Sequence, residues 1–249
     1  MSLSIVIPCR NEENNISLTI DKIIKYLKSK ITDYELNLIN DFSTDKTYDV
    51  IRDISKTNNS VKVYNNLNKG LGGAINLGIK VSTKKFMVIV MADLSDSPKD
   101  IINYYMEIKK RKLDAVFGSR FTSQSKLKNY PLKKKILNRI FNYLVKIVFW
   151  EKYNDFTNAF KIYRVKTLKE IKPIVSENFN VFLELPLKII IRGYKYSVIP
   201  IDWQNRELGE PKFKFHELGS KYIFTLLYCF LEKILLKKKA KNEDGEEKI

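Results

Sequence analysis

The chain has 249 residues, which is enough to bury a core in one large α/β domain or in one domain with an appendage. Its composition is that of an ordinary folded protein, but the formal net charge of +17 predicts an anionic partner: nucleic acid, a phosphate-rich substrate or an acidic membrane surface. The single histidine, His216, excludes histidine-based zinc sites and Ser/His/Asp triads, and the two distant cysteines, Cys9 and Cys229, indicate a reducing compartment rather than a disulfide scaffold.

Residues 1–120 alternate strand and helix patterns. Short apolar runs predict strands at residues 3–8, 35–40, 60–64, 86–90 and 114–118. Helical patterns cover residues 13–30, the segment from the glycine cluster to about residue 81, and residues 98–110. Another helix follows the turn 41–45 to about residue 56, with Ser43 or Thr44 as its N-cap. This order predicts a mostly parallel, Rossmann-like sheet with helices on both faces.

The second half of the chain is more mixed. Helical patterns cover residues 131–150, 181–192 and 217–236, and strand patterns cover residues 159–164 and 196–201. Residues 237–249 are all but free of apolar side chains, and we expect them to be disordered. We therefore divide the chain into an α/β domain at residues 1–215, a C-terminal amphipathic helix at residues 216–236 and a charged tail at residues 237–249.

The sequence indicates contact with a membrane surface rather than a membrane-spanning helix. The N-terminus has no basic leader before its short apolar run, and no window reaches the roughly 18 uncharged apolar residues that a spanning helix needs. Residues 131–150 and 222–236 combine apolar stripes with flanking lysines, as an interfacial helix at an anionic leaflet does. Packing on the sheet or on a partner subunit is the alternative interpretation.

Acidic residues follow three of the predicted strands. Glu12, Asp41 and Asp93 come after the first, second and fourth strands, whose carboxyl ends meet at one edge of a parallel sheet. Such carboxylates accept hydrogen bonds from a base or ribose, or bind a hard metal ion such as Mg²⁺ or Mn²⁺. Helix capping is the alternative, and it is less favoured for three acids at one edge than for a single acid.

A glycine cluster, Gly70-Leu71-Gly72-Gly73, precedes a predicted helix. Glycines at a helix N-terminus can hold a phosphate group. However, no Gly-Lys-Ser/Thr follows, so the cluster is not a P-loop, and it is not a GxGxxG motif in register after a strand. A tight turn is the favoured interpretation.

Five short motifs carry a resemblance when they are taken in order. They are Pro-x-Arg-Asn-Glu at residues 8–12, Asn-Asp-x-Ser-x-Asp-x-Thr at 40–47, Asn-x-Gly-x-Gly-x-Ala at 68–74, Ala-Asp-Leu-Ser at 92–95 and Gly-Ser-Arg at 118–120. This order resembles the inverting family 2 glycosyltransferases of GT-A fold. Residues 155–160 and 200–212 are similar to segments of the dolichol-phosphate mannose synthase branch, and the resemblance covers about residues 3–236.

The resemblance implies a nucleotide-binding site and a metal site. The positions that match the grip on the nucleobase and ribose are Pro8, Arg10, Glu12, Ile39 and Asp41. Ala92 and Asp93 match the diphosphate and metal region, and Ser95 stands at the position of a second oxygen ligand for Mg²⁺ or Mn²⁺.

The resemblance also implies a phosphate-binding set, and the chain departs from the family pattern twice. Arg120, Arg206 and Lys212 match basic residues that bind phosphates. Met91 replaces the first acid of the usual pair, which would weaken metal binding or alter the choice of metal. Pro211 replaces a small polar residue before Lys212 and leaves the geometry of that loop open.

The implied activity is inverting transfer of a sugar from a nucleoside diphosphate sugar to a polyprenyl phosphate. A phosphate monoester is mostly dianionic at neutral pH, so this acceptor needs cations but no general base, and Asp93 and Arg206 are the implied catalytic residues. If the acceptor is instead a saccharide hydroxyl in surface polysaccharide synthesis, a base is required, and Asp155 is the candidate, with a structural cap as its alternative role.

Two interpretations from other classes remain open. The first is that the chain is a non-catalytic nucleotide- or nucleic-acid-binding protein. The second is that it is a scaffold in a membrane complex. The sequence lacks the interleaved aromatic and basic residues of a nucleic-acid-binding sheet, so we expect no nucleic-acid partner. We expect a peripheral protein at the cytoplasmic face of a membrane that contacts anionic lipid or a membrane-protein partner, and homo-oligomerisation is left open.

Overall fold

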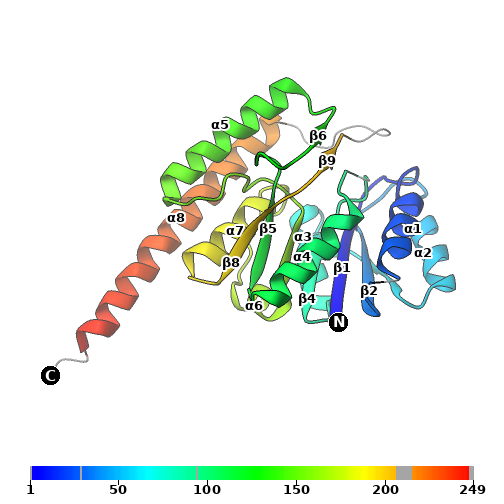
Figure 1. Cartoon of the computed structure of the whole chain (residues 1–249), viewed down its shortest axis with the longest axis horizontal. Coiled ribbons are helices and arrows are strands. Elements are labelled where there is room, and N and C mark those ends of the chain that lie inside the picture. Colours follow the sequence, from blue (N-terminus) through cyan, green and yellow to red (C-terminus); the bar gives the residue numbers. More distant parts are fainter. Residues whose placement is uncertain (1, 29, 94, 206–214, 247–249) are drawn as a thin grey trace.

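The computed structural model describes residues 2–28, 30–93, 95–205 and 215–246, and a seven-stranded sheet lies at its centre (Figure 1). The strands of this sheet are β1 (Ser2–Cys9), β2 (Asp33–Asn40), β3 (Val61–Asn65), β4 (Phe86–Ile89), β5 (Ala115–Ser119), β7 (Lys161–Arg164) and β8 (Tyr196–Pro200). A separate two-stranded sheet joins β6 (Leu127–Lys128) to β9 (Trp203–Gln204). The helices are α1 (Ile16–Leu27), α2 (Thr47–Thr57), α3 (Leu71–Val81), α4 (Pro98–Lys110), α5 (Leu132–Phe149), α6 (Val165–Glu170), α7 (Val181–Ile191) and α8 (Phe215–Glu246).

The strand order of the large sheet is β3-β2-β1-β4-β7-β5-β8. All pairs in it are parallel except those of β7, which runs antiparallel to β4 and β5. The mostly parallel sheet predicted from the sequence is therefore confirmed. Because β7 is reversed, its first residue lies at the edge where β1, β2, β4 and β5 end, and the segment before β7 enters that edge.

Two hydrophobic clusters cover the two faces of the sheet, as the alternation of side chains along a strand requires. In β4, Phe86 and Val88 belong to the cluster that α1, α2 and α4 cover, whereas Met87 and Ile89 belong to the cluster under α3, α5, α6, α7 and α8. Burial of each large aliphatic side chain stabilises the fold by about 1.5–3 kcal/mol, so runs buried on both faces hold the sheet and fix its edge.

The structure differs from the sequence-based prediction in a few elements. The N-cap of α2 is Lys46, so the prediction of Ser43 or Thr44 is wrong; the Asn11 Oδ1 instead accepts a hydrogen bond from the Thr44 backbone N–H at 2.8 Å. The two-residue strands β6 and β9 and the short helix α6 were not predicted, because such short elements have no detectable periodicity. Helix α8 continues to Glu246, into the segment expected to be disordered, where lysine, alanine and glutamate favour helix.

Helix α5 carries its apolar stripe on the outside. The side chains that α5 buries are Asn142, Val145 and Phe149, whereas Ile136, Leu137, Ile140, Leu144 and Ile147 are exposed. Helix α8 lies beside α5 (Figure 1) and likewise exposes Ile223, Phe224, Leu227, Leu231 and Leu235. Within the described ranges, no helix combines the length and apolarity needed to cross a membrane.

Candidate active site

The carboxyl edge of the sheet gathers most of the predicted site residues. Glu12 follows β1, Asp41 follows β2, Asp93 follows β4 and Arg120 follows β5. Asp155 lies in the segment that leads into the reversed strand β7. Ligands of open α/β sheets bind at this edge, so the topology alone makes it the candidate site.

Asp41 holds the glycine turn in place. Its Oδ1 accepts hydrogen bonds from the Asn66 Nδ2 and from the Gly70 backbone N–H, both at 2.8 Å. Gly70 has φ +118°, and a Cβ there would lie 2.5 Å from the carbonyl oxygen of Glu177. The Gly72 N–H at the start of α3 donates to that same carbonyl at 2.8 Å. The cluster is therefore a tight turn, as favoured above, and a protein group occupies a helix-terminal donor that a phosphate would need.

The loops after β1 and β2 lie against each other. Pro8 and Ile39 are register partners and both are buried, whereas Arg10 is exposed at the edge. Glu12 is buried: its Oε2 accepts from the Asn15 Nδ2 at 3.0 Å, and its backbone N–H donates to a threonine hydroxyl of α2 at 2.7 Å. The structure thus brings Pro8, Arg10, Glu12, Ile39 and Asp41 to adjacent strand ends.

The loop after β4 concentrates acidic side chains. Asp93, Ser95 and Asp96 are all buried, and the Asp93 Oδ1 accepts a hydrogen bond from the Ser95 N–H at 3.1 Å. The Asp96 Oδ2 accepts from the Met91 N–H at 3.2 Å, while the Met91 side chain packs against the core. Burial and the nearby charge of Asp93 raise the pKa of Asp96 to about 7. Sequence reasoning missed Asp96, although it lies three residues after Asp93.

These oxygen groups fit a hard divalent cation. The described residues contain no group of three or more histidine, cysteine, aspartate or glutamate side chains that would hold a metal without a ligand. Mg²⁺ usually takes only one or two carboxylates from the protein and completes its shell with phosphate oxygens and water. The number and type of oxygen groups of Asp93, Ser95 and Asp96 match this requirement. Burial and the charge of Asp93 make ionisation of Asp96 costly, and a bound cation would reduce that cost.

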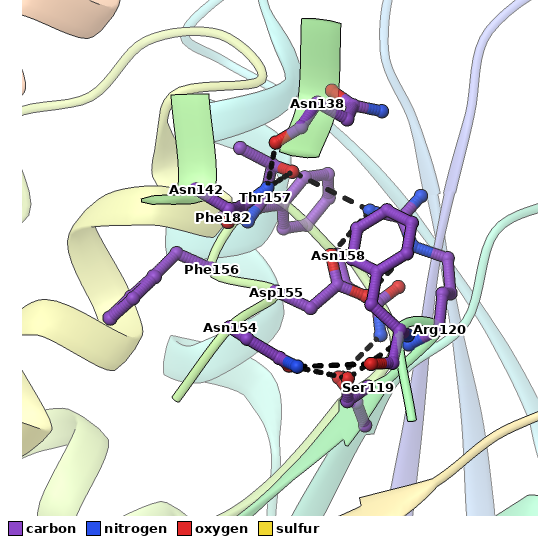
Figure 2. Close-up of polar contacts among 12 residues, drawn as sticks. Ser119, Arg120, Asn138, Asn142, Asn154, Asp155, Phe156, Thr157, Asn158 and Phe182 are labelled. Carbon is purple, nitrogen blue, oxygen red and sulfur yellow. Dashed lines mark hydrogen bonds and ion pairs between the residues drawn. The ribbon is translucent and has the colours of Figure 1, made fainter. Parts of the chain in front are cut away.

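Arg120 and Asp155 form a buried ion pair. The Arg120 Nη2 donates to the Asp155 Oδ1 at 2.7 Å, and its Nε and backbone N–H donate to the Oδ2 at 2.9 and 2.8 Å (Figure 2). Asp155 is 0% exposed. Burial alone would lower the pKa of Arg120, but the charge of Asp155 raises it above its ordinary value, so Arg120 remains a cation. Both carboxylate oxygens of Asp155 are therefore committed to Arg120.

The remaining contacts of Arg120 are weak hydrogen bonds and aromatic faces, and one of them joins its Nη2 to the Thr157 hydroxyl at 3.5 Å. Its Nη1 donates to the Tyr130 hydroxyl at 3.4 Å, a weak contact, and the guanidinium lies 5.8 Å from the Tyr130 ring centre and 5.5 Å from that of Phe121. The Tyr130 ring in turn packs against Trp203 with ring centres 4.7 Å apart. Aromatic faces hold a guanidinium without using its N–H groups, so they orient Arg120 and keep donors for a ligand.

The segment 153–158 is tied to its surroundings by a hydrogen-bond network. The Asn158 Nδ2 and the Tyr153 hydroxyl both donate to the Gly118 carbonyl at 3.0 Å. The Asn142 Nδ2 of α5 donates to the Thr157 hydroxyl at 3.1 Å, and Asn142 and Thr157 face each other in Figure 2. Asp155 is thus fixed between β5 and α5.

Arg206 and Lys212, the other predicted phosphate-binding residues, lie outside the described residues. The chain that leads to them is placed: Trp203 bridges to Asp96, the Gln204 N–H donates to the Ser95 carbonyl at 3.2 Å, and the Asn205 N–H donates to the Lys128 carbonyl at 3.0 Å. The segment therefore leaves the described structure directly beside the acidic loop.

The fold and the groups at its edge are those of a GT-A-like α/β protein with a site for an anionic ligand. The chain belongs to glycosyl transferase family 2, whose profile matches residues 4–172. The structure of glucosyl-3-phosphoglycerate synthase from Mycobacterium tuberculosis, in complex with Mn²⁺, uridine diphosphate and phosphoglyceric acid, superimposes with a TM-score of 0.71 at 18% identity, over 92% of this chain and 78% of that chain. This likeness supports the GT-A fold.

Three characterised relatives are similar over most of the chain. A dolichol-phosphate mannosyltransferase of Pyrococcus furiosus is 27% identical over 86% of this chain and 60% of its own length. A dodecaprenyl-phosphate galacturonate synthase of Rhizobium johnstonii is 28% identical over 86% of this chain and 62% of its own length. An undecaprenyl-phosphate mannosyltransferase of Micrococcus luteus is 26% identical, over 85% and 87% respectively. The chain thus spans about three fifths of the length of the first two relatives.

Proposed function

We propose that the protein is an inverting glycosyltransferase that moves a sugar from a nucleoside diphosphate sugar to a polyprenyl phosphate. All three relatives described above carry the name of a prenyl-phosphate sugar transferase or synthase. The observation that carries the proposal for this chain is the Arg120–Asp155 pair. It fixes a cation at the carboxyl edge, and both oxygens of the only acid in the pair accept hydrogen bonds from that cation. That edge suits an acceptor that is already an anion.

The donor would bind across the ends of β2, β1 and β4. Pro8, Arg10, Glu12, Ile39 and Asp41 would surround its base and ribose, and Ala92 and Asp93 would face its diphosphate. The register partnership of Pro8 and Ile39 supports this arrangement, because it sets the two strand ends side by side. The sugar would then extend toward β5 and Arg120, on the far side of β4 and β7 in the sheet order.

A Mg²⁺ or Mn²⁺ ion would be held by Asp93 and Ser95, with Asp96 beside them. When bound, the ion would neutralise charge that develops on the leaving diphosphate. The protein's own contribution is to keep the acidic loop compact, through the hydrogen bonds of Asp93 to Ser95 and of Asp96 to the Met91 backbone. The thioether of Met91 is a soft group that a hard cation does not prefer, so the carboxylates carry the site.

The acceptor phosphate would bind to Arg120, with Arg206 and Lys212 as further cations. A prenyl phosphate has a second pKa of about 6 and is mostly dianionic at neutral pH, so it attacks without a general base. Asp155 would then fix Arg120 rather than accept a proton, since it is fully buried and both of its oxygens already accept hydrogen bonds from Arg120. This geometry favours the lipid phosphate over a saccharide hydroxyl as acceptor.

The lipid would reach the site from the exposed apolar face of α5 and α8. Tyr130 and Asn138, at the N-terminal end of α5, share a hydrogen bond of 2.6 Å beside Arg120, so this helix leads from the apolar face to the cation. Exposed lysines at 133 and 134 precede the stripe. We place this face on the anionic cytoplasmic leaflet, where such basic and apolar surfaces bind.

The test is incubation of the purified protein with a panel of nucleotide sugars, Mg²⁺ or Mn²⁺, and either a short polyprenyl phosphate or a soluble saccharide. We expect a prenyl-linked product for at least one donor, with inverted configuration at the anomeric carbon. The matching prenyl alcohol serves as the control acceptor and should give none, because it is not a dianion at neutral pH. Transfer to the saccharide alone would refute the lipid-phosphate acceptor.

A further inference from the structure

Lys161, the first residue of β7, is a fully buried lysine whose amine contacts the segment behind Asp155. It is 0% exposed. Its Nζ donates hydrogen bonds to the backbone carbonyls of Phe156 at 3.0 Å, of Asn158, and of Phe182 in α7 at 3.4 Å. It forms no ion pair with any residue that the structure describes. Within the described part of the chain, peptide dipoles and charges further away are therefore what neutralises the ammonium group.

Burial of a lysine in this way is costly. Loss of hydration lowers the pKa of Lys161 to about 7, although the negative charges of Asp155 and Asp96 favour the charged form; Arg120 opposes it. The Tyr153 ring, 5.9 Å away, faces the same amine, and burial raises the pKa of Tyr153 well above its ordinary value, so Tyr153 stays neutral. A hydrophobic residue of similar length would avoid this cost. The presence of a lysine, with three N–H donors, therefore indicates a specific role for its amine.

The contacts of Lys161 explain what the donors do. Phe156 and Asn158 flank Thr157 and directly follow Asp155, and their carbonyls both point to the Lys161 amine. The third carbonyl, of Phe182, belongs to the first turn of α7, so the lysine fastens the segment 156–158 to a rigid helix of the core. Asp155 at the start of the segment makes three hydrogen bonds to Arg120 (Figure 2).

We propose that Lys161 is a positioning residue for sugar transfer: its amine holds the segment 156–158 so that Asp155 keeps the Arg120 guanidinium oriented toward the acceptor phosphate. The part that concerns the acceptor rests on the function proposed above. The part that concerns Arg120 rests only on the contacts of the three residues.

Lys161→Met tests the positioning directly, because methionine fills a similar volume without donors. The readout is the ¹⁵N–¹H signal of the Arg120 Nε–H, assigned by its loss in Arg120→Lys. This hydrogen is buried and bonded to Asp155, so we expect one slowly exchanging signal in the wild type that shifts or broadens in Lys161→Met. Lys188→Met is the matched control. Lys188 is equally buried but is paired with Glu184 and contacts Tyr228, and its amine makes none of the contacts to the segment 156–158.

The same variants are then compared in sugar transfer. We expect Lys161→Met to lower kcat/KM for the short prenyl phosphate by about 10- to 100-fold, because small displacements of a binding group cost rates of this order. The KM for the nucleotide sugar should change little, since the donor binds at other strand ends. Lys188→Met should be less stable, but the ratio of its kcat/KM for the prenyl phosphate to its KM for the nucleotide sugar should equal that of the wild type.

The pH profile separates a charged positioning group from a structural one. The amine is charged below its pKa, so wild-type kcat/KM for the acceptor should fall as the pH rises through about 7. Lys161→Arg keeps a positive charge at every pH tested and should move this loss to higher pH. If the arginine variant does not fold, Lys161→Met is used instead, and its residual activity should not show the fall in kcat/KM above about pH 7.

Three outcomes overturn the inference: an unchanged Arg120 signal in Lys161→Met, an equal change in Lys188→Met, or a kinetic defect that falls equally on donor and acceptor. A wild type that transfers no sugar to any prenyl phosphate would refute the proposed function. The Arg120 signal would still decide the positioning role in that case.

Discussion

At the scale of single residues, the Arg120–Asp155 pair shows how burial changes the role of an acid. An exposed ion pair is worth little, whereas a buried one is destabilising when broken because the remaining charge has no solvent. Both carboxylate oxygens of Asp155 accept hydrogen bonds from Arg120, three in all. Asp155 therefore orients Arg120 and does not act as a free carboxylate.

Asp155→Asn should lower the free energy of unfolding by about 3–5 kcal/mol, because Arg120 stays buried and charged without its partner. Urea denaturation measures the change. The double variant Arg120→Met with Asp155→Leu should recover most of the stability and none of the transfer activity. Asp53→Asn, which removes the exposed pair with Lys56, is the control and should have no measurable effect. A loss in Asp155→Asn no larger than in this control would show that the pair is not buried in solution.

Asp93→Ala should weaken Mn²⁺ binding in the presence of nucleoside diphosphate, measured as free Mn²⁺ by electron paramagnetic resonance. The reason is that the proposed function assigns Asp93 to the metal and the donor diphosphate, and that Asp93 is buried at the carboxyl edge of the sheet. Asp100→Asn serves as the control, because Asp100 is a buried acid of α4 that bonds Asn103 and the Asp202 backbone instead. Equal Mn²⁺ binding by wild type and Asp93→Ala would remove Asp93 from the metal site.

At the scale of elements, the turn before α3 and the strand β2 depend on single buried carboxylates. Asp41 fixes the glycine turn, and Glu35 joins strands and loops at the opposite edge. Each carboxylate accepts a hydrogen bond from a backbone N–H group of an irregular segment, which has no regular backbone partners of its own. Both effects can be tested by stability measurements.

Gly70→Ala should destabilise the protein by about 1–3 kcal/mol or more, since a left-handed backbone strains a residue with a Cβ and the Cβ would also meet the Glu177 carbonyl. Gly193→Ala is the matched control: Gly193 has φ +74°, but no atom lies within 4 Å of its Cβ position. Thermal unfolding of the two variants separates the collision from the backbone strain. Equal losses would mean that the close approach to Glu177 contributes nothing.

Glu35 predicts a defined pH dependence. Burial would raise its pKa, but hydrogen bonds from Thr83, Ser4 and Lys62 lower it to about 2, below the ordinary value of 4.5. A lowered pKa adds stability that is complete above pH 4.5 and is lost as the pH falls toward about 2. Glu35→Gln should therefore be less stable than wild type by about 1–3 kcal/mol at neutral pH, with a difference that shrinks in acid. A difference that is constant across this range would contradict the assignment.

At the scale of the whole molecule, one side is unlike the rest of the surface. Helices α5 and α8 bury only narrow faces and turn their apolar stripes outward, and Trp150 at the end of α5 is 91% exposed. Glu232 ties α8 to the core through ion pairs with Lys188 of α7 and with Arg192, which directly follows α7. The apolar surface is thus rigidly attached to the sheet that carries the candidate site.

Ile140→Asp with Leu227→Asp should lower binding to vesicles of anionic phospholipid by at least about tenfold, because each side chain would otherwise leave water. Co-sedimentation measures binding, and high salt should weaken it further by screening the lysines. Met106→Asp is the control, since Met106 is exposed to a similar degree on α4, a different part of the surface. Unchanged binding of the double variant would place the membrane contact elsewhere.

The sequence by itself determined the alternation of strands and helices and the acids at the strand ends. Apolar runs buried on both faces have a strong pattern, and a carboxylate directly after such a run must lie at the edge of the sheet. Glu12, Asp41 and Asp93 could be found in this way. The same reasoning recorded the apolar stripe of α5 but could not say which way it faces, because periodicity describes a face and not its partner.

Only the tertiary structure decided which of these groups meet. The reversal of β7 brings Asp155 to Arg120, thirty-five positions away in the chain, and buries Lys161 behind both. The loop after β4 also turns Asp96 toward the Met91 backbone, where the sequence had shown only a missing acid. The physical reason is that ion pairs and buried amines depend on contacts between distant segments, and those contacts follow from the strand order, which no local pattern encodes.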